Sequence, residues 1–302
     1  MSILFFQKRE NPACCTGEQP EAKIVDPPVH TGLDIQRQTV QPWLRSSLIR
    51  LVIIPLLVFL VWMLDMYLLA GIPRLFSRNN PAGLLLYSFF SCILLGILVP
   101  MTCITSSFLS GIVNTFQLGF RSVRRTVYAC AMVAFAGYAC IILFSPRGID
   151  QIAFAHAVLL FLPTSIAVVM VCWVLIGTHV QAFIIPVGVL ASILTGIIVT
   201  ALLFSISFFI LLPQQNPDPA IMLLFCIGCA VAIFFFAVRD VYPTILVVTF
   251  AMVFAGISSV DSRYLYQPTP VVYAAVIVTM GVLLGIHVYF SRHYTSIPVP
   301  SP

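Results

Sequence analysis

The stretch FCIGCAVAIFFFAVRDVYPTILVVTF, residues 225–250, consists of two apolar runs separated by Arg239 and Asp240. Neither run has the alternating polarity that is typical of a strand in a membrane barrel, and both belong to longer apolar runs, 219–238 and 242–260. Both are far more apolar than a helix on the surface of a soluble protein. The stretch therefore predicts a membrane-spanning helix, a short charged break, and a second apolar helix.

The composition of the whole chain agrees with this interpretation. Of its 302 residues, 60% are hydrophobic and only 8% are charged. A soluble protein of this length cannot bury so large a share of apolar side chains in a core. The chain is therefore expected to lie in a lipid bilayer, and the expected location is the cell membrane.

Apolar runs long enough to cross about 30 Å of hydrocarbon predict an all-α, polytopic transmembrane bundle of about eight helices. The expected spans are residues 47–70, 82–108, 126–145, 153–177, 184–212, 219–238, 242–260 and 270–291. They define a transmembrane domain at 46–293, with a largely disordered cytoplasmic tail at 1–45 and a short cytoplasmic tail at 294–302.

The basic residues give the expected orientation. With the N-terminus inside, eleven of the fifteen lysines and arginines fall on the inner side and four on the outer side. This bias predicts that both termini are cytoplasmic. It also accounts for the net charge of +5 without a nucleic-acid partner.

Ionisable residues inside the spans are the first candidates for chemistry, because a charge in hydrocarbon is costly. Asp65 is the one aspartate clearly within a predicted span, and it could meet Arg74 at the interface instead of binding a proton or an ion. His156, His179 and His287 lie near helix ends. His179 and His287 could meet on the cytoplasmic side, but zinc would need further ligands. Helix capping is therefore favoured, with no metal and no cofactor.

Cys226 and Cys229 have the CxxC spacing used in thiol–disulfide exchange. Membrane oxidoreductases of this type generally carry a second cysteine pair, and the other cysteines of the spans form no second CxxC. Small residues also let transmembrane helices approach closely. Close packing by Cys226, Gly228, Cys229 and Ala230 is therefore favoured over redox chemistry.

Two other groups of residues predict helix packing. The first contains the small residues Ser192, Gly196 and Thr200, with Ala134, Gly137 and Ala139 on another span. The second is the polar run 102–110, which follows Pro100 and predicts a kink with hydroxyls facing the bundle interior. Such hydroxyls more commonly bond to their own helix backbone.

Three segments resemble motif regions of the CPBP (CAAX protease and bacteriocin-processing, or Abi) family of intramembrane proteases, which have about eight transmembrane helices. They are Leu118-Gly119-Phe120-Arg121-Ser122-Val123-Arg124-Arg125, residues 191–209 with Phe204, and Pro243-Thr244-Ile245-Leu246. The resemblance implies paired glutamates near 163–165 and two histidines. The chain has no glutamate after residue 21, Phe208 stands at one histidine position, and Val247 or Val248 stands at the other.

Phenylalanine and valine can neither bind a metal nor transfer a proton. The sequence therefore favours a non-catalytic, pseudoprotease-like protein that binds or scaffolds another membrane protein or a lipid. Two alternatives stay open: a thiol oxidoreductase that uses Cys226 and Cys229, and a small transporter or channel component that uses Asp65 or the polar second span.

Overall fold

The computed structural model describes residues 48–70, 81–110, 113, 118–144, 151–211, 217–256 and 265–294. Contacts divide the chain into two units, Met1–Gln41 and Pro42–Pro302, and all described residues belong to the second. The predicted tail at 1–45, Arg74, and the predicted tail at 294–302 except Tyr294 lie outside the described residues.

All regular elements in the described part of the chain are helices, as predicted. They are η1 (Ile49–Ile53), α2 (Ile54–Ala70), α3 (Pro81–Tyr87), η2 (Ser88–Leu98), α4 (Val99–Leu109), α6 (Val123–Phe144), α7 (Gln151–Val168), η3 (Val169–Gly177), α8 (Thr178–Ile184), α9 (Val189–Leu211), α10 (Pro217–Val238), α11 (Val241–Gly256) and α13 (Pro270–Tyr294). The η segments are π-helical, and they join their neighbours into the rods η1–α2, α3–η2–α4 and α7–η3–α8.

Six helical rods of the described chain are long and apolar enough to cross a bilayer. They are 49–69, 81–109, 151–184, 189–209, 221–238 and 270–292. The other two predicted spans coincide with α6, which carries Arg124 and Arg125 in its first turn, and with α11, which has 16 residues. The chain is therefore a multi-pass helical membrane protein, and eight spans are compatible with the helices found.

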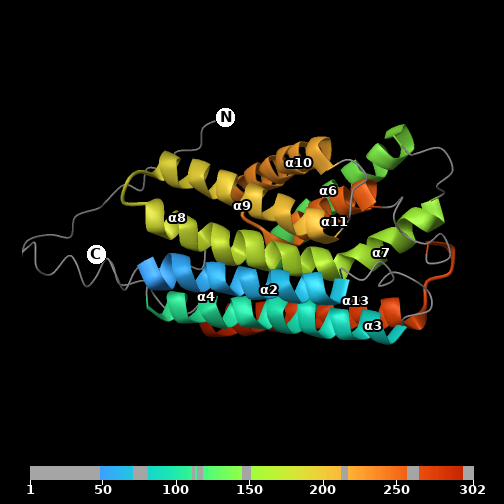
Figure 1. Ribbon diagram of the computed structural model, residues 1–302, viewed down its shortest axis with the longest axis horizontal. Helices are drawn as coiled ribbons and strands as arrows, with labels where there is room; N and C mark the ends of the chain where they lie inside the picture. The colour runs from blue at the N-terminus through green and yellow to red at the C-terminus, as the bar shows by residue number, and fades with distance from the viewer. Residues whose placement is uncertain are drawn as a thin grey trace, which may run out of the picture. The chain divides into compact units, whose positions relative to one another are not determined.

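The rod α7–η3–α8 is the centre of the bundle. In its most apolar stretch 89% of the residues are buried, compared with 28–44% in the other five rods. Figure 1 shows this rod between α9 and α10 on one side and α2, α4 and α13 on the other. It packs against η2, α9, α11 and α13. This placement explains why the sequence of the rod is apolar on every side.

Small residues allow the outer helices to pack closely, as predicted for Gly137 and Gly196, whereas the prediction is wrong for Ala134, which is exposed. A Cβ on Gly137 of α6 would lie 2.3 Å from the ring of Phe250 in α11. On α9, a Cβ on Gly196 would lie 3.0 Å from the ring of Phe236, and Ser192 and Thr200 are buried beside it. Side chains at the two glycines would push the helices apart.

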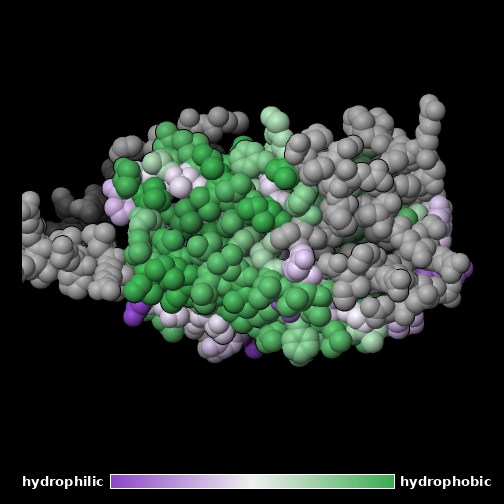
Figure 2. Space-filling view, viewed as in Figure 1, coloured by the Kyte–Doolittle hydropathy of each residue, from purple (hydrophilic) through white to green (hydrophobic). Residues whose placement is uncertain are grey.

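The exterior of the bundle is apolar. Figure 2 shows hydrophobic residues over most of the face formed by α2, α8 and α9. The exposed leucines include Leu57, Leu64, Leu190 and Leu194. In water, so large an apolar surface would cause aggregation, whereas in a bilayer it is the normal surface that contacts lipid.

Candidate functional site: the polar junction between α10 and α11

Arg239 and Asp240, the charged break between the two apolar runs of residues 225–250, join the end of α10 directly to the start of α11. Arg239 ends α10 in the left-handed region, with φ = 53°, and its N–H still donates to the carbonyl of Phe235 at 2.7 Å. Glycine usually occupies this position because it has no Cβ. Asp240 then caps α11, since its Oδ1 accepts the N–H of Tyr242 at 3.2 Å. Aspartate is a favoured residue at such a cap.

The segment before α6 completes the cap of α11. The N–H of Val241 donates to the carbonyl of Gly119 at 3.0 Å, and Pro243 has no N–H to satisfy. Gly119 has φ = 79°, and a Cβ there would lie 3.1 Å from Cγ2 of Val241. A glycine is therefore required at this position for both its backbone conformation and its close approach.

Arg121 of this segment and Arg125 in the first turn of α6 cap the end of α10. The Nε of Arg121 donates to the carbonyl of Arg239 at 2.9 Å, and Nη2 of Arg125 donates to the carbonyl of Val238 at 3.1 Å. Cationic side chains at a helix C-terminus also interact favourably with its dipole. The structure thus joins two segments that the sequence placed in separate motifs.

Asp240 is completely buried in this junction. Its Oδ2 accepts the hydroxyl of Thr126 at 2.7 Å, and its backbone carbonyl accepts the hydroxyl of Thr244 at 2.7 Å. Burial raises the pKa of the Asp240 carboxyl, partly offset by the bonds from Thr126 and Tyr242 and by the charge of Arg125. The sequence singled out Asp65 and missed Asp240, although an aspartate just before an apolar run is a helix-start signal.

His287 of α13 extends the junction to the last helix. Its Nδ1 lies 2.9 Å from the hydroxyl of Tyr242, and its ring is 5.2 Å from that of Phe120. It also bonds to the backbone of Arg121. His287 therefore links α13 to α11 and to the segment before α6. None of these partners is also a partner of His179.

The guanidinium of Arg239 has fewer hydrogen-bond acceptors than it has donors, and its charge is not paired with an acidic residue of the described chain. Its Nη2 donates to Oε1 of Gln181 on α8 at 2.8 Å, and its Cζ lies 5.0 Å from the ring centre of Phe236. Its Nη1 and the Nε2 of Gln181 are buried without a hydrogen-bond partner. Burial lowers the pKa of Arg239, and the charge of Arg121 lowers it further.

His179 is paired with Ser107, a contact that the sequence did not predict. Nδ1 of His179 lies 2.7 Å from the carbonyl of Leu175, so Nδ1 carries the proton and Nε2 accepts from the hydroxyl of Ser107 at 2.8 Å. A serine bonded to an oriented histidine is the arrangement used in nucleophilic catalysis. Here Ser107 is 8% and His179 1% exposed, so both side chains lie in the packed interior.

Asp65 lies in a second polar cluster, between α2, η2 and α7. Its Oδ2 accepts the hydroxyl of Ser91, and the carbonyl of Ser91 accepts Nε1 of Trp62 at 3.0 Å. Close by, the hydroxyls of Tyr87 and Thr164 are 3.1 Å apart. The carboxylate is thus held by a helix–helix contact.

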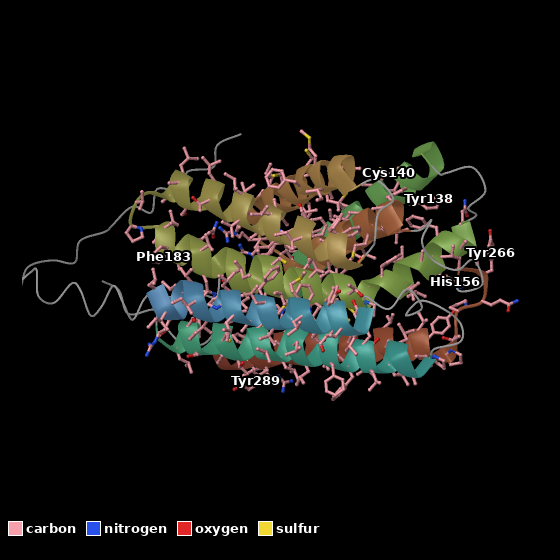
Figure 3. The ribbon with its side chains drawn as sticks, viewed as in Figure 1. Tyr138, Cys140, His156, Phe183, Tyr266 and Tyr289 are labelled. Atoms are coloured by element: carbon pink, nitrogen blue, oxygen red, sulfur yellow. The ribbon has the colours of Figure 1, made fainter. Side chains whose placement is uncertain are left out.

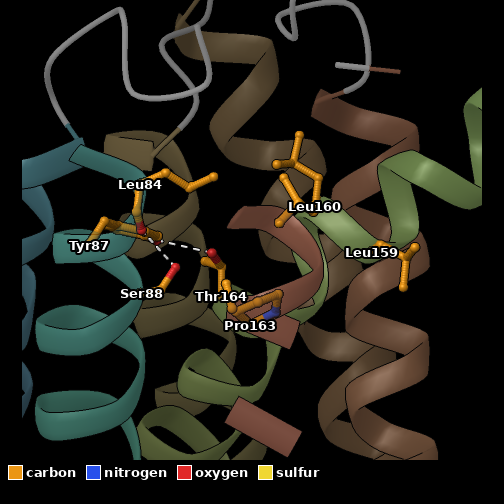
Figure 4. A pocket seen from close by; sticks show the side chains of 9 residues that line it. Leu84, Tyr87, Ser88, Leu159, Leu160, Pro163 and Thr164 are labelled. Carbon is orange, nitrogen blue, oxygen red and sulfur yellow. Dashed lines mark hydrogen bonds between the residues drawn. The ribbon is translucent and has the colours of Figure 1, made fainter. Parts of the chain in front are cut away.

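A small cavity lies beside this cluster, at the proline of α7 (Figure 4). Pro163 has no N–H, so the carbonyl of Leu159 loses its usual partner in the helix. Both residues line the cavity, together with Tyr87, Ser88 and Thr164. Its volume of about 10 Å³ is close to the minimum for one water molecule. The cavity is too small for a substrate.

The other predicted candidates lie apart from these clusters. His156 is half-buried, and its Nδ1 donates to the carbonyl of Leu265 at 2.7 Å. Figure 3 places His156 and Tyr138 toward one end of the bundle and Phe183 toward the other. In the described chain, no three His, Cys, Asp or Glu residues are grouped closely enough to hold a metal ion.

Cys226 and Cys229 are free thiols on α10, the first exposed and the second half-buried. The close packing predicted for this stretch is made by Gly228, because a Cβ there would lie 2.9 Å from the carbonyl oxygen of Ala201 in α9. The packing prediction is therefore correct for Gly228. It is wrong for Cys226 and Ala230, which are exposed.

The positions at which the family resemblance implies catalytic residues lie in the packed interior. Phe204 and Phe208 are buried, and their ring centres are 5.5 Å apart. The ring centres of Phe204 and Trp173 are 5.4 Å apart. Ser165 bonds to the sulfur of Met252 at 3.2 Å. No protein-family model, curated protein or solved structure matches this chain.

A groove of about 450 Å³ opens between α6 and α7. It is lined by Ala134, Tyr138, Gln151, Phe154, Ala155, Val158, Leu159 and Phe250. Its polar residues are Tyr138 and Gln151. The side-chain amide nitrogen of Gln151 donates to the phenol oxygen of Tyr138 at 3.4 Å. The rest of the lining is apolar. A groove of about 420 Å³ between α9 and α10 has Ser205 as its polar residue, and that hydroxyl bonds to the carbonyl of Ala201.

Proposed function

We propose that this chain is a non-catalytic multi-pass protein of the cell membrane that binds a lipid in the groove between α6 and α7. The observation that supports the proposal is the chemistry of the groove, which is apolar along its walls and carries the polar pair Tyr138 and Gln151. An acyl chain fits between the helices, and the pair can bond to the polar end of the same molecule.

The size of the groove favours a lipid over a transmembrane helix. Its volume of about 450 Å³ is in the range of small-ligand sites. An α-helix with side chains is about 10–12 Å wide, and two turns of it would fill roughly twice this volume. The packing of α6 agrees with a lipid-binding groove. α6 packs mainly on α11, through Gly137 and Phe250, and the groove therefore stays open between α6 and α7.

The test is lipid retention by the purified full-length protein. Ala134→Phe and Ala155→Phe would fill the groove from its two walls, and both alanines are exposed, so the core is unaffected. Ala230→Phe places the same ring on an exposed position of α10 as the control. We expect native mass spectrometry to show a retained phospholipid in the wild type and in Ala230→Phe, and its loss in the groove variants.

Equal retention in all four proteins would overturn the proposal. Co-purification of a membrane protein that is lost in Ala155→Phe would assign the groove to a partner helix and would also overturn lipid binding there. The thiol oxidoreductase and transporter alternatives have separate readouts: thiol trapping at Cys226 and Cys229, and solute flux in liposomes.

A further inference from the structure

A second binding site is indicated at the α10–α11 junction, at a distance from the groove. We propose that the guanidinium of Arg239, together with the side-chain amide of Gln181, binds the phosphate of an anionic lipid headgroup. This site is built from other residues than the groove, and it does not depend on the groove being occupied.

Two hydrogen-bond donors at this junction, one on Arg239 and one on Gln181, have no acceptor in the described part of the protein. Arg239 uses Nη2 to bind Oε1 of Gln181 at 2.8 Å, whereas its Nη1 and the Nε2 of Gln181 are buried without an acceptor. Gln181 is only 2% exposed. Buried donors of this kind almost always have a partner, because leaving one without a partner is destabilising. Two adjacent donors, one of them on a cation, call for an acceptor that carries negative charge.

The charge balance of the junction leads to the same ligand. Arg121 and Arg125 bond to the backbone at Arg239 and Val238, and Arg124 lies in the first turn of α6, whereas the carboxylate of Asp240 is occupied by Thr126 and the N–H of Tyr242. Arg124 and Arg125 are exposed at the start of α6. A guanidinium binds phosphate well because its planar donors match two phosphate oxygens.

The location at the membrane favours a lipid as the source of the phosphate. The predicted topology places Arg239 and the start of α6 on the cytoplasmic side, where anionic lipids attract basic residues at the surface. Arg239 is half-buried and lies just beyond the last residue of a membrane-spanning rod. A residue just past the end of a membrane-spanning helix is expected at the depth of the lipid headgroups, where a soluble anion would have to displace the lipid.

The backbone holds the guanidinium in place for this role. The left-handed conformation of Arg239 is unfavourable for a residue other than glycine, so the surrounding structure must hold it. Arg121 and Arg125 hold that turn through its carbonyl groups. Gly196 of α9 lies next to Cγ of Gln181 and the ring of Phe236, so α9 packs against the stem of Gln181.

The test is thermal unfolding of the full-length protein in nanodiscs of phosphatidylcholine with increasing fractions of phosphatidylglycerol. We expect Tm to rise with phosphatidylglycerol for the wild type. Arg239→Gln should weaken the apparent affinity by about tenfold or more, the value of one lost charged hydrogen bond. Arg124→Gln removes an exposed charge at the same junction and is the control, which should keep most of the rise.

Gln181→Glu makes the test independent of how well Arg239→Gln folds. It places a carboxylate of nearly the same shape beside the guanidinium, so the protein gains its own counter-charge. We expect a higher Tm in phosphatidylcholine alone and no further rise with phosphatidylglycerol. Retention of the full rise in Gln181→Glu, or equal losses in Arg239→Gln and Arg124→Gln, would overturn the proposal.

Inorganic phosphate in phosphatidylcholine nanodiscs distinguishes the two sources of the anion. No effect on Tm at millimolar concentrations supports the lipid headgroup. A rise equal to that with phosphatidylglycerol would assign the site to a soluble phosphate instead. No response of the wild type to either probe would show that the buried donors bind only a water molecule.

Discussion

The hydroxyl of Thr126 donates to Oδ2 of Asp240 at 2.7 Å, and this bond fixes the start of α6 to the start of α11. Asp240 thereby satisfies two donors at once, since its Oδ1 accepts the N–H of Tyr242. We expect Asp240→Ala to destabilise the protein by about 2–4 kcal/mol, from the lost helix cap and the unpaired buried hydroxyl. Asp240→Asn keeps an acceptor and should cost much less, measured as a shift of thermal unfolding in detergent.

The pH dependence of stability should differ between the wild type and Asp240→Asn. Burial raises the pKa of the Asp240 carboxyl, so the folded protein holds this proton to higher pH than the unfolded chain does. Stability from this group must therefore fall as pH rises from about 4, the ordinary aspartate value, through the raised pKa. A smaller decline of Tm in Asp240→Asn over that range is the expected result. An identical decline would show that another group is responsible.

Gly119→Ala tests the backbone of the segment before α6. Gly119 has φ = 79°, and an added Cβ would lie 3.1 Å from Cγ2 of Val241. The left-handed conformation alone costs about 1–2 kcal/mol for alanine, so a clear drop in Tm is expected. Gly281→Ala in α13 is the control, because nothing lies within 4 Å of the added Cβ. That change should stabilise the helix by up to about 1 kcal/mol.

The membrane class and the positions of the helices could be predicted from the sequence because they depend on local hydropathy. Each of the eight predicted apolar runs coincides with a described helix or rod. The sequence could not show that α7–η3–α8 is central, since the other rods are about as apolar as this one. Hydropathy does not distinguish a face that meets lipid from a face that meets protein.

The candidate site could be predicted only in part, because its contacts join distant segments. The stretches around Gly119 and around Arg239 were recognised separately, yet their hydrogen bonds depend on how α6 and α11 pack. Asp240 was missed because it lies between two spans and not within one. The pairing of His179 with Ser107 joins α8 to α4, and no spacing in the sequence encodes it.

Gly228→Ala should separate the two interpretations of the CxxC stretch. The added methyl group would lie 2.9 Å from the carbonyl oxygen of Ala201, so α9 and α10 must move apart. We expect a loss of about 1–3 kcal/mol. Cys226→Ala changes an exposed side chain and should stay within about 0.5 kcal/mol of the wild type. If the cysteine variant is instead the less stable one, the thiols have a structural role that the packing does not explain.

Ser107→Ala tests whether the bond to His179 holds α4 and α8 together. The change leaves Nε2 of His179 without a donor inside the protein, because Nδ1 is already committed to the carbonyl of Leu175. The expected cost is about 1–3 kcal/mol. Ser106→Ala removes an exposed hydroxyl one residue away and should be nearly neutral. The same pair of variants also tests for catalysis: a fluorophosphonate that labels the wild type and Ser106→Ala, but not Ser107→Ala, would show that Ser107 is a reactive nucleophile and that its burial is transient.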